Sequence, residues 1–196
     1  MSIKNLIEIR KKGRKNFVRD LVRTIDQLYN TPSISTCVPF NEGRGQFDSV
    51  KIAKIIKSLD KTRFVDRTSG WIDQNGLDFK SMNIFNKEIK FKSDKLNRPI
   101  VLTEFGGFGR IIKNHFGCQR QFSYLMYDTK LRLTKGIKNL LKYEVYPNIE
   151  KGLCASVYTT LSDIEEEINR FLTYDRKIVK VDKKISREVN DLLKLV

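Results

Sequence analysis

Apolar residues along the chain alternate between helical spacings and short continuous runs. A helical spacing begins at Phe17 and continues to Tyr29, where the sequence Asn30-Thr31-Pro32 stops it. A second helical spacing covers residues 50–59. The continuous runs are typical of short buried strands. They cover residues 33–40, 64–66, 82–85, 100–103 and 153–158.

Two further helices are predicted in the C-terminal half. The first covers about residues 119–145, and the second places Val189, Leu192 and Leu193 on one face of the segment 187–195. Strands that alternate with helices favour a parallel α/β fold. In barrels of this class, the chemistry lies at the carboxyl ends of the strands.

Two of the predicted strands are followed by a glutamate. Glu42 follows the run 33–40 through Asn41, and Glu104 follows the run 100–103. Paired acids at neighbouring strand ends suit glycoside hydrolysis, in which one carboxyl group donates a proton and the other attacks the sugar. Helix caps and salt bridges also place acids at strand ends, so the pattern alone leaves both interpretations open.

The composition indicates a folded protein, because the 196 residues are 40% hydrophobic and 31% charged. No apolar run approaches the ~18 residues that a membrane span requires, and no signal-peptide pattern follows Met1. The cysteines, Cys37, Cys118 and Cys154, form no C-x-x-C pair, so we expect neither a disulfide framework nor a zinc site. Cys37 and Cys154 lie in apolar runs and are expected to be core thiols. We therefore expect a reducing compartment and a cytoplasmic protein.

The net charge of +15 permits binding to nucleic acid through phosphate contacts. The densest basic segment is RKKGRK, residues 10–15, and the other lysines and arginines are scattered. The sequence contains no RNP-like aromatic motif, no zinc-finger spacing and no convincing helix-turn-helix. We therefore favour a lysine-rich surface over a nucleic-acid function and keep a basic polyanion-binding protein as a remote alternative.

Four segments together resemble the catalytic domain of glycoside hydrolase family 2, the family of β-galactosidases and β-glucuronidases. They are VPFNEGRGQFDS (38–49), FVDRTSGWIDQNGLDFKS (64–81), RPIVLTEFGGFG (98–109) and YPNIEKGLCASVYTTLSDIEEEINRFLTYDRK (146–177). The similarity is strongest to bacterial members in which the first motif reads N-E-G-W-G-Q-F-D, and it covers nearly the whole chain.

The resemblance implies a retaining O-glycosyl hydrolase that acts on a β-glycoside through two glutamates. Glu42 in FNEG matches the general acid/base of the family, and Glu104 in LTEFGG matches its nucleophile. Asn41 matches the amide that binds the sugar 2-hydroxyl, a contact that strengthens in the transition state. This chemistry requires no cofactor and no metal.

Three further residues are candidates for the substrate pocket. Trp71 could stack on a sugar face, although an anchor for its loop is an equal alternative. Asp78 and Tyr158 are candidates for the pocket lining, and the alternative for Tyr158 is a core tyrosine with a satisfied hydroxyl. We expect the lone His115 to be structural or at the surface. The acidic run 163–167 is expected to start a helix or to form a solvated loop, rather than to bind a metal.

The resemblance begins just before the fourth strand of the family's barrel. A (β/α)8 barrel typically needs about 250 residues, so the chain predicts a partial TIM barrel, roughly its fourth to eighth strands with their helices. Residues 1–196 would form a single incomplete catalytic domain without the N-terminal barrel strands and β-sandwich domains. The open barrel edges would require self-association or a complementing fragment.

Three residues depart from the family pattern. Asn83 replaces a histidine, and Phe85 replaces a tyrosine whose hydroxyl binds the nucleophile in the family. Arg44 replaces a tryptophan and places a cation next to Glu42, which favours the ionised acid. These departures support an alternative in which the chain is a truncated, catalytically inactive remnant or one piece of a split glycosidase.

Overall fold

The structure is a computed structural model that describes residues 3–43, 45–73 and 78–192, apart from the side chains of 3–9 and 192. Arg44 and Leu193 therefore lie outside the described residues. The chain divides into two compact units, Met1–Phe79 and Lys80–Val196, and each is described by itself.

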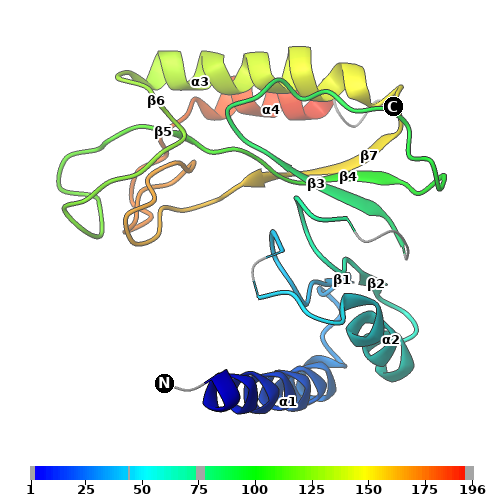
Figure 1. Ribbon diagram of the computed structural model, residues 1–196. Helices are drawn as coiled ribbons and strands as arrows, with labels where there is room; N and C mark the ends of the chain where they lie inside the picture. Colours follow the sequence, from blue (N-terminus) through cyan, green and yellow to red (C-terminus); the bar gives the residue numbers. More distant parts are fainter. Residues whose placement is uncertain (1–2, 44, 74–77, 193–196) are drawn as a thin grey trace. The chain divides into compact units, whose positions relative to one another are not determined.

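Among its described residues, the first unit contains two helices and one pair of parallel strands. In chain order, the elements are α1 (Ile3–Leu28), β1 (Thr36–Cys37), α2 (Ser49–Leu59) and β2 (Phe64–Val65). Strand β1 pairs with β2 in parallel (Figure 1). The predicted helix 50–59 is confirmed, whereas the predicted strand 33–40 is only two residues long.

An apolar core holds these elements together. Its buried residues come from both helices, from β2 and from the segment after β1, and they are Ile25, Phe40, Ile52, Ala53, Ile56 and Val65. The ring of Phe17 on α1 stacks on Phe40 with the ring centroids 5.1 Å apart, and Phe47 meets both rings edge-on. This aromatic cluster fixes the segment that carries Asn41 and Glu42 against α1.

The second unit is built on a parallel sheet of three strands. These are β3 (Lys80–Ile84), β4 (Ile100–Gly106) and β7 (Leu153–Thr159), in the order β3-β4-β7. A separate parallel pair joins β5 (Phe108–Gly109) to β6 (Leu125–Met126). The predicted strands 100–103 and 153–158 are confirmed, although β4 continues past Glu104 to Gly106.

Helices cover one face of this sheet (Figure 1). Helix α3 (Lys130–Asn139) continues into a π-helical segment, η1 (Leu140–Val145), and a 3-10 turn, η2 (Tyr146–Asn148). Helix α4 (Lys183–Leu192) packs beside α3. Their buried apolar side chains form one core with those of the sheet, including Leu102, Phe105, Leu133, Ile137 and Val189.

The predicted helix 119–145 is wrong in its first part. Residues 125–126 form β6, and the helix begins only after Thr129. The Thr129 side chain accepts a hydrogen bond from the Arg132 amide, which caps the first turn. Of the apolar residues just before Thr129, Phe122, Leu125 and Met126 are exposed, and Tyr127 packs against the core of the sheet.

The described residues include only parallel strand pairs in the named sheets and form no closed barrel. The partial TIM barrel therefore remains a prediction. Within the same residues, no helix combines the length and the apolar character needed to cross a membrane. The expectation that Cys154 is a core thiol is wrong, since this residue is exposed on β7.

Candidate functional site

Glu104 lies at an irregularity in strand β4. Met82 pairs with Leu102 and Asn83 pairs with Glu104, so Thr103 is an extra residue in β4 at this point. Such a bulge breaks the alternation of side chains along a strand. Thr103 and Glu104 are accordingly both half-buried, between the fully buried Leu102 and Phe105.

A chain of hydrogen bonds joins the side chains around this bulge. The Asn83 amide nitrogen, Nδ2, donates to Glu104 Oε1 at 3.0 Å. The Thr103 hydroxyl donates to Asn83 Oδ1 at 2.7 Å. Asn83 is buried, with 7% of its surface exposed. Asn83, which departs from the family pattern, therefore binds Glu104, which the resemblance matches to the nucleophile.

Two glycines after Glu104 make room for aromatic rings. Gly106 has a φ of +86°, and a Cβ atom there would lie 2.2 Å from Tyr158 Cε2. Gly107 has a φ of +66°, and its Cβ would lie 2.4 Å from Tyr124 Cδ2. Because these values lie in the left-handed region and the space is filled, only glycine fits the EFGG motif at both positions.

Tyr158 is held by structural contacts on all sides of its ring. Its hydroxyl accepts a hydrogen bond from the Phe108 amide at 3.1 Å. The ring stacks on Phe171, with centroids 4.4 Å apart, and meets Phe105 edge-on. Burial raises the pKa of the Tyr158 hydroxyl well above its usual value. This geometry matches the alternative of a core tyrosine with a satisfied hydroxyl, and a substrate role for Tyr158 stays a prediction.

The aromatic side chains beyond the EFGG loop form a cluster that sequence reasoning missed. Phe85 stacks on Tyr124 with ring centroids 4.1 Å apart and an interplanar angle of 3°. Phe122 meets Tyr124 edge-on and is 42% exposed. The signal in the sequence was the alternation of Phe122 and Tyr124, but the predicted helix over this segment concealed it.

Glu42 and Asn41 lie in the first unit, at the turn after β1. Asn41 forms a parallel bridge to Ser69, and the Glu42 amide donates to the Ser69 carbonyl at 2.7 Å. Glu42 has a φ of +51°, a left-handed conformation that is uncommon for a residue with a side chain. Such strained positions often lie at functional sites. Glu104 belongs to the second unit, so the two glutamates are described separately.

The remaining pocket candidates of the first unit differ in their surroundings. Trp71 is 56% exposed in a turn, and so its indole is accessible to a ligand. Asp78 instead binds its own unit: Oδ2 accepts a hydrogen bond from the Val65 amide at 2.7 Å and forms an ion pair with Lys57, also at 2.7 Å. These contacts hold Asp78, near the end of the first unit, against β2 and α2.

The expectation of a helix start or solvated loop at 163–167 is wrong for Asp163. This carboxylate is buried and accepts two hydrogen bonds from Lys180 Nζ, at 2.7 and 2.8 Å. Lys180 is fully buried and also donates to the Ile168 carbonyl. Desolvation lowers the pKa of Lys180. The part of the chain that the structure describes contains no group of three or more His, Cys, Asp or Glu side chains placed to hold a metal ion.

His115 has a structural partner, in line with its expected role. Its Nδ1 lies 2.8 Å from Asp175 Oδ2, and its carbonyl accepts a hydrogen bond from the Tyr174 amide. Asp175 also accepts from the Thr173 hydroxyl at 2.7 Å. The Thr173 hydroxyl and, to a lesser extent, His115 lower the pKa of Asp175 to about 2. The bonds of His115 join the loop between β5 and β6 to the loop between β7 and α4.

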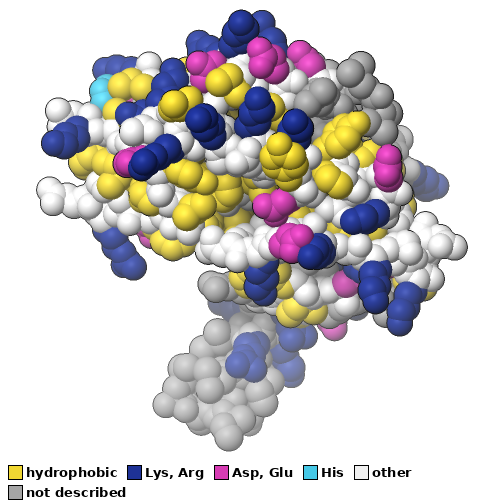
Figure 2. All heavy atoms as spheres, turned by 90° about the horizontal axis from the view of Figure 1, so that it is seen from above, with side chains coloured by type: hydrophobic (Ala, Val, Ile, Leu, Met, Phe, Trp, Pro, Cys, Tyr) yellow, Lys and Arg dark blue, Asp and Glu magenta, His cyan; other side chains and the backbone are white. Residues whose placement is uncertain are grey.

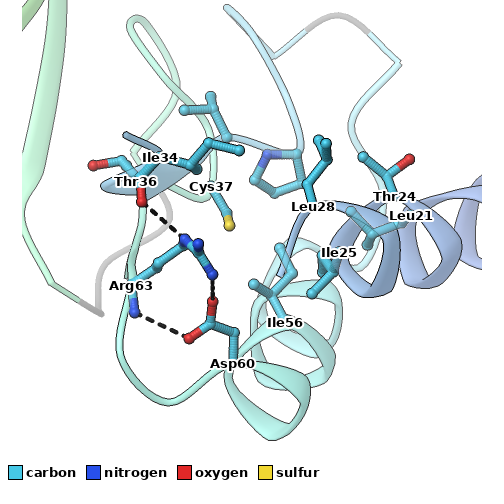
Figure 3. A pocket seen from close by; sticks show the side chains of 12 residues that line it. Leu21, Thr24, Ile25, Leu28, Ile34, Thr36, Cys37, Ile56, Asp60 and Arg63 are labelled. Atoms are coloured by element: carbon cyan, nitrogen blue, oxygen red, sulfur yellow. Dashed lines mark hydrogen bonds and ion pairs between the residues drawn. The ribbon is translucent and has the colours of Figure 1, made fainter. Parts of the chain in front are cut away.

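A cavity of about 210 Å³ lies in the first unit between α1, α2 and the β1 segment (Figure 3). Its wall is mostly apolar, with Leu21, Ile25 and Ile56 among the lining side chains. Arg63 and Asp60 pair at one side of it. The lining residues include none of the predicted site residues, and the two charged groups among them, Asp60 and Arg63, pair with each other.

The visible surface agrees with the expectation of scattered basic residues. In Figure 2, lysine and arginine side chains are interspersed with acidic and apolar side chains. Three of the exposed basic residues, Lys130, Arg132 and Lys135, lie on α3. Arg132 pairs with the neighbouring Asp128. Charge alone therefore marks no focused site on the face shown.

Comparison with known proteins gives no relative from which a role could be transferred. No family model matches the chain, and no curated protein matches it.

Proposed function

We propose that the chain is the catalytic part of a retaining β-glycosidase, with Glu104 as the nucleophile and Glu42 as the acid/base. The observation that carries this proposal is the hydrogen bond from the Asn83 amide to Glu104 Oε1. Glu104 is half-buried on a bulged strand, and the neutral amide of Asn83 is one of its hydrogen-bond donors. A nucleophilic carboxylate needs such an oriented and accessible oxygen.

The reaction would proceed in two balanced steps. In the first, a Glu104 oxygen bonds to the anomeric carbon, the glycosidic C–O bond breaks, and the leaving oxygen takes the proton of Glu42. In the second, Glu42 accepts a proton from a water molecule whose oxygen attacks the anomeric carbon and releases Glu104. Retention by this route requires the two carboxyl groups to lie about 5–5.5 Å apart.

The substrate would be a β-glycoside bound by polar and aromatic contacts. Asn41 is exposed beside Glu42 and can reach a sugar hydroxyl, and Trp71 offers an exposed indole face. In the second unit, the exposed part of the Phe122 ring offers a similar apolar surface. These contacts fit a sugar ring without specifying its hydroxyl configuration.

A second copy of the chain, or a complementing fragment, would cover the open sheet. Strand β7 lies at one edge of the three-stranded sheet. Val157 on this strand is 54% exposed, and Cys154 is exposed as well. An exposed apolar edge strand pairs readily with another chain, so we expect activity to depend on what covers β7.

The proposal is tested by hydrolysis of a panel of nitrophenyl β-glycosides. We expect release of nitrophenol from at least one of them, and Glu104→Gln should abolish it because the amide cannot attack the anomeric carbon. Glu88→Gln is the matched control, since Glu88 is an exposed glutamate of the same unit. Its activity should equal that of the unchanged protein.

Two outcomes would contradict the proposal. One is an absence of turnover across the panel at protein concentrations at which self-association is complete. The other is a turnover that Glu104→Gln leaves intact. The first outcome would favour the inactive remnant, and the second would indicate a different catalytic residue.

A further inference from the structure

Asn83 occupies the position from which a side chain on β3 can reach Glu104. The two residues are partners in the register of β3 and β4, directly after the bulge. The distance from Asn83 Nδ2 to Glu104 Oε1 is 3.0 Å, and the Asn83 side chain is buried. The bulge breaks the alternation of side chains along β4 and brings Thr103 within reach of Asn83. The polar side chains of Asn83, Thr103 and Glu104 therefore meet at this point.

The Glu104 carboxylate determines which way the Asn83 amide points, because an ionised carboxylate only accepts hydrogen bonds and therefore faces the NH₂ group. The Thr103 hydroxyl fits this orientation, since it lies 2.7 Å from Asn83 Oδ1 and 3.2 Å from the Met82 carbonyl and can donate to either acceptor. A reversed amide would place Oδ1 against Glu104 Oε1 at a distance of about 3 Å, which is repulsive unless the carboxyl group is protonated.

We infer that Asn83 is the positioning residue of the nucleophile, in contact with Thr103 through Oδ1 and bound to one oxygen of Glu104 through Nδ2. This inference rests on the proposed function. The bond leaves the charge of the carboxylate in place, because an amide is neutral, and it restricts rotation of the carboxyl group. The carboxyl group is then held in one orientation relative to the strand.

Phe85 cannot perform this task. It has no hydroxyl, and its ring stacks on Tyr124. The neutral donor to Glu104 comes instead from Asn83, two residues earlier on the same segment. The two departures from the family pattern are thus linked: where Phe85 offers no donor, Asn83 provides one.

The test combines a labelling rate with an NMR signal. The full-length protein is treated with a panel of 2-deoxy-2-fluoro-β-glycosyl fluorides, which label the nucleophile and release fluoride. We expect Asn83→Leu to lower the labelling rate at saturating reagent about 10–100-fold, as misplacement of a reacting group does. The reagent concentration for half-maximal rate should not change. Thr103→Val should act in the same direction, and Asn139→Leu, at an exposed amide on α3, should have no effect.

The NMR signal is the side-chain NH₂ of Asn83, assigned in the unaltered protein by through-bond correlation to the backbone of Asn83. We expect Glu104→Ala to move one of its protons upfield, because the charged acceptor is removed. An unchanged signal would overturn the inference, as would an unchanged labelling rate in both Asn83→Leu and Thr103→Val. If the unaltered protein takes up no label, the proposed function fails, and the NMR signal of Glu104→Ala still decides the contact of Asn83. Because Glu104→Ala and Thr103→Val keep Asn83, the test does not depend on the folding of Asn83→Leu.

Discussion

At the scale of single residues, sequence motifs indicate candidate catalytic acids but not the side chains that contact them. The LTEFGG motif made Glu104 a candidate nucleophile, and its glycines, Gly106 and Gly107, leave room for the rings of Tyr158 and Tyr124. The bulge at Thr103 could not be predicted, because its residues carry no turn signal and the register depends on the neighbouring strand. The sequence showed Asn83 only as a replacement of the family's histidine and did not indicate its contact with Glu104.

Variants of the buried ion pair between Lys180 and Asp163 measure what this pair contributes to the free energy of unfolding. Lys180→Met would leave the Asp163 carboxylate buried without its partner. We expect the free energy of unfolding to fall by about 3–5 kcal/mol, measured by urea denaturation. The double variant Lys180→Met/Asp163→Leu should recover most of this loss, since no charge remains buried. A loss in the double variant that equals or exceeds that of the single variant would contradict the role of the uncompensated charge.

The hydrogen bond from the Thr173 hydroxyl to Asp175 is expected to make a pH-dependent contribution to stability. The folded-state pKa of Asp175 is lowered to about 2, first by the Thr173 hydroxyl, whereas an unfolded aspartate titrates near 3.9. A lowered pKa stabilises the fold above about pH 4, and this contribution is lost as the pH falls to about 2.

The variant Thr173→Val tests this dependence. Its deficit in unfolding free energy should be largest above pH 4 and should shrink towards pH 2, leaving a constant part from the lost bond to the Ile178 amide. Ser123→Ala removes a hydroxyl that contacts the carbonyl groups of Gly107 and Leu125, so this variant should show the same deficit at every pH. A deficit of Thr173→Val that does not vary with pH would refute the assignment.

At the scale of elements, periodicity predicted the type of segment better than its ends. The helix 50–59 and the strands 100–103 and 153–158 were found because packing and sequence pattern agree there. The start of α3 was missed although Thr129 is a typical helix cap, because apolar residues before it imitate helical spacing. Caps would have been the better guide at both C-terminal helices.

Asp182 caps α4 in the same way. Its Oδ1 accepts hydrogen bonds from the amides of Lys184 and Ile185 at 2.9 and 3.1 Å. We expect Asp182→Ala to lower the unfolding free energy by about 1 kcal/mol, and Asp182→Asn, which retains a capping oxygen, to lower it much less. Equal losses in the two variants, measured by thermal denaturation, would mean that Asp182 does not act as a cap.

At the scale of the whole molecule, the chain contains two units with separate apolar cores. Sequence patterns could not reveal this division, because no linker or change in composition marks residue 79. We expect a fragment of residues 80–196 to fold alone, since β3, β4, β7 and their covering helices share one core. A cooperative thermal transition followed by near-UV circular dichroism would confirm this, whereas a fragment without fixed tertiary signal would show that the first unit is required.

The proposed role of Glu104 as the nucleophile of a retaining glycosidase is tested most directly by mass spectrometry. The intact, full-length protein is measured after treatment with the panel of 2-deoxy-2-fluoro-β-glycosyl fluorides. We predict a mass increase of one fluorosugar with at least one reagent, located in the peptide that contains Glu104 and absent in Glu104→Gln. No mass increase with any of the reagents, or a label on another residue, would contradict it.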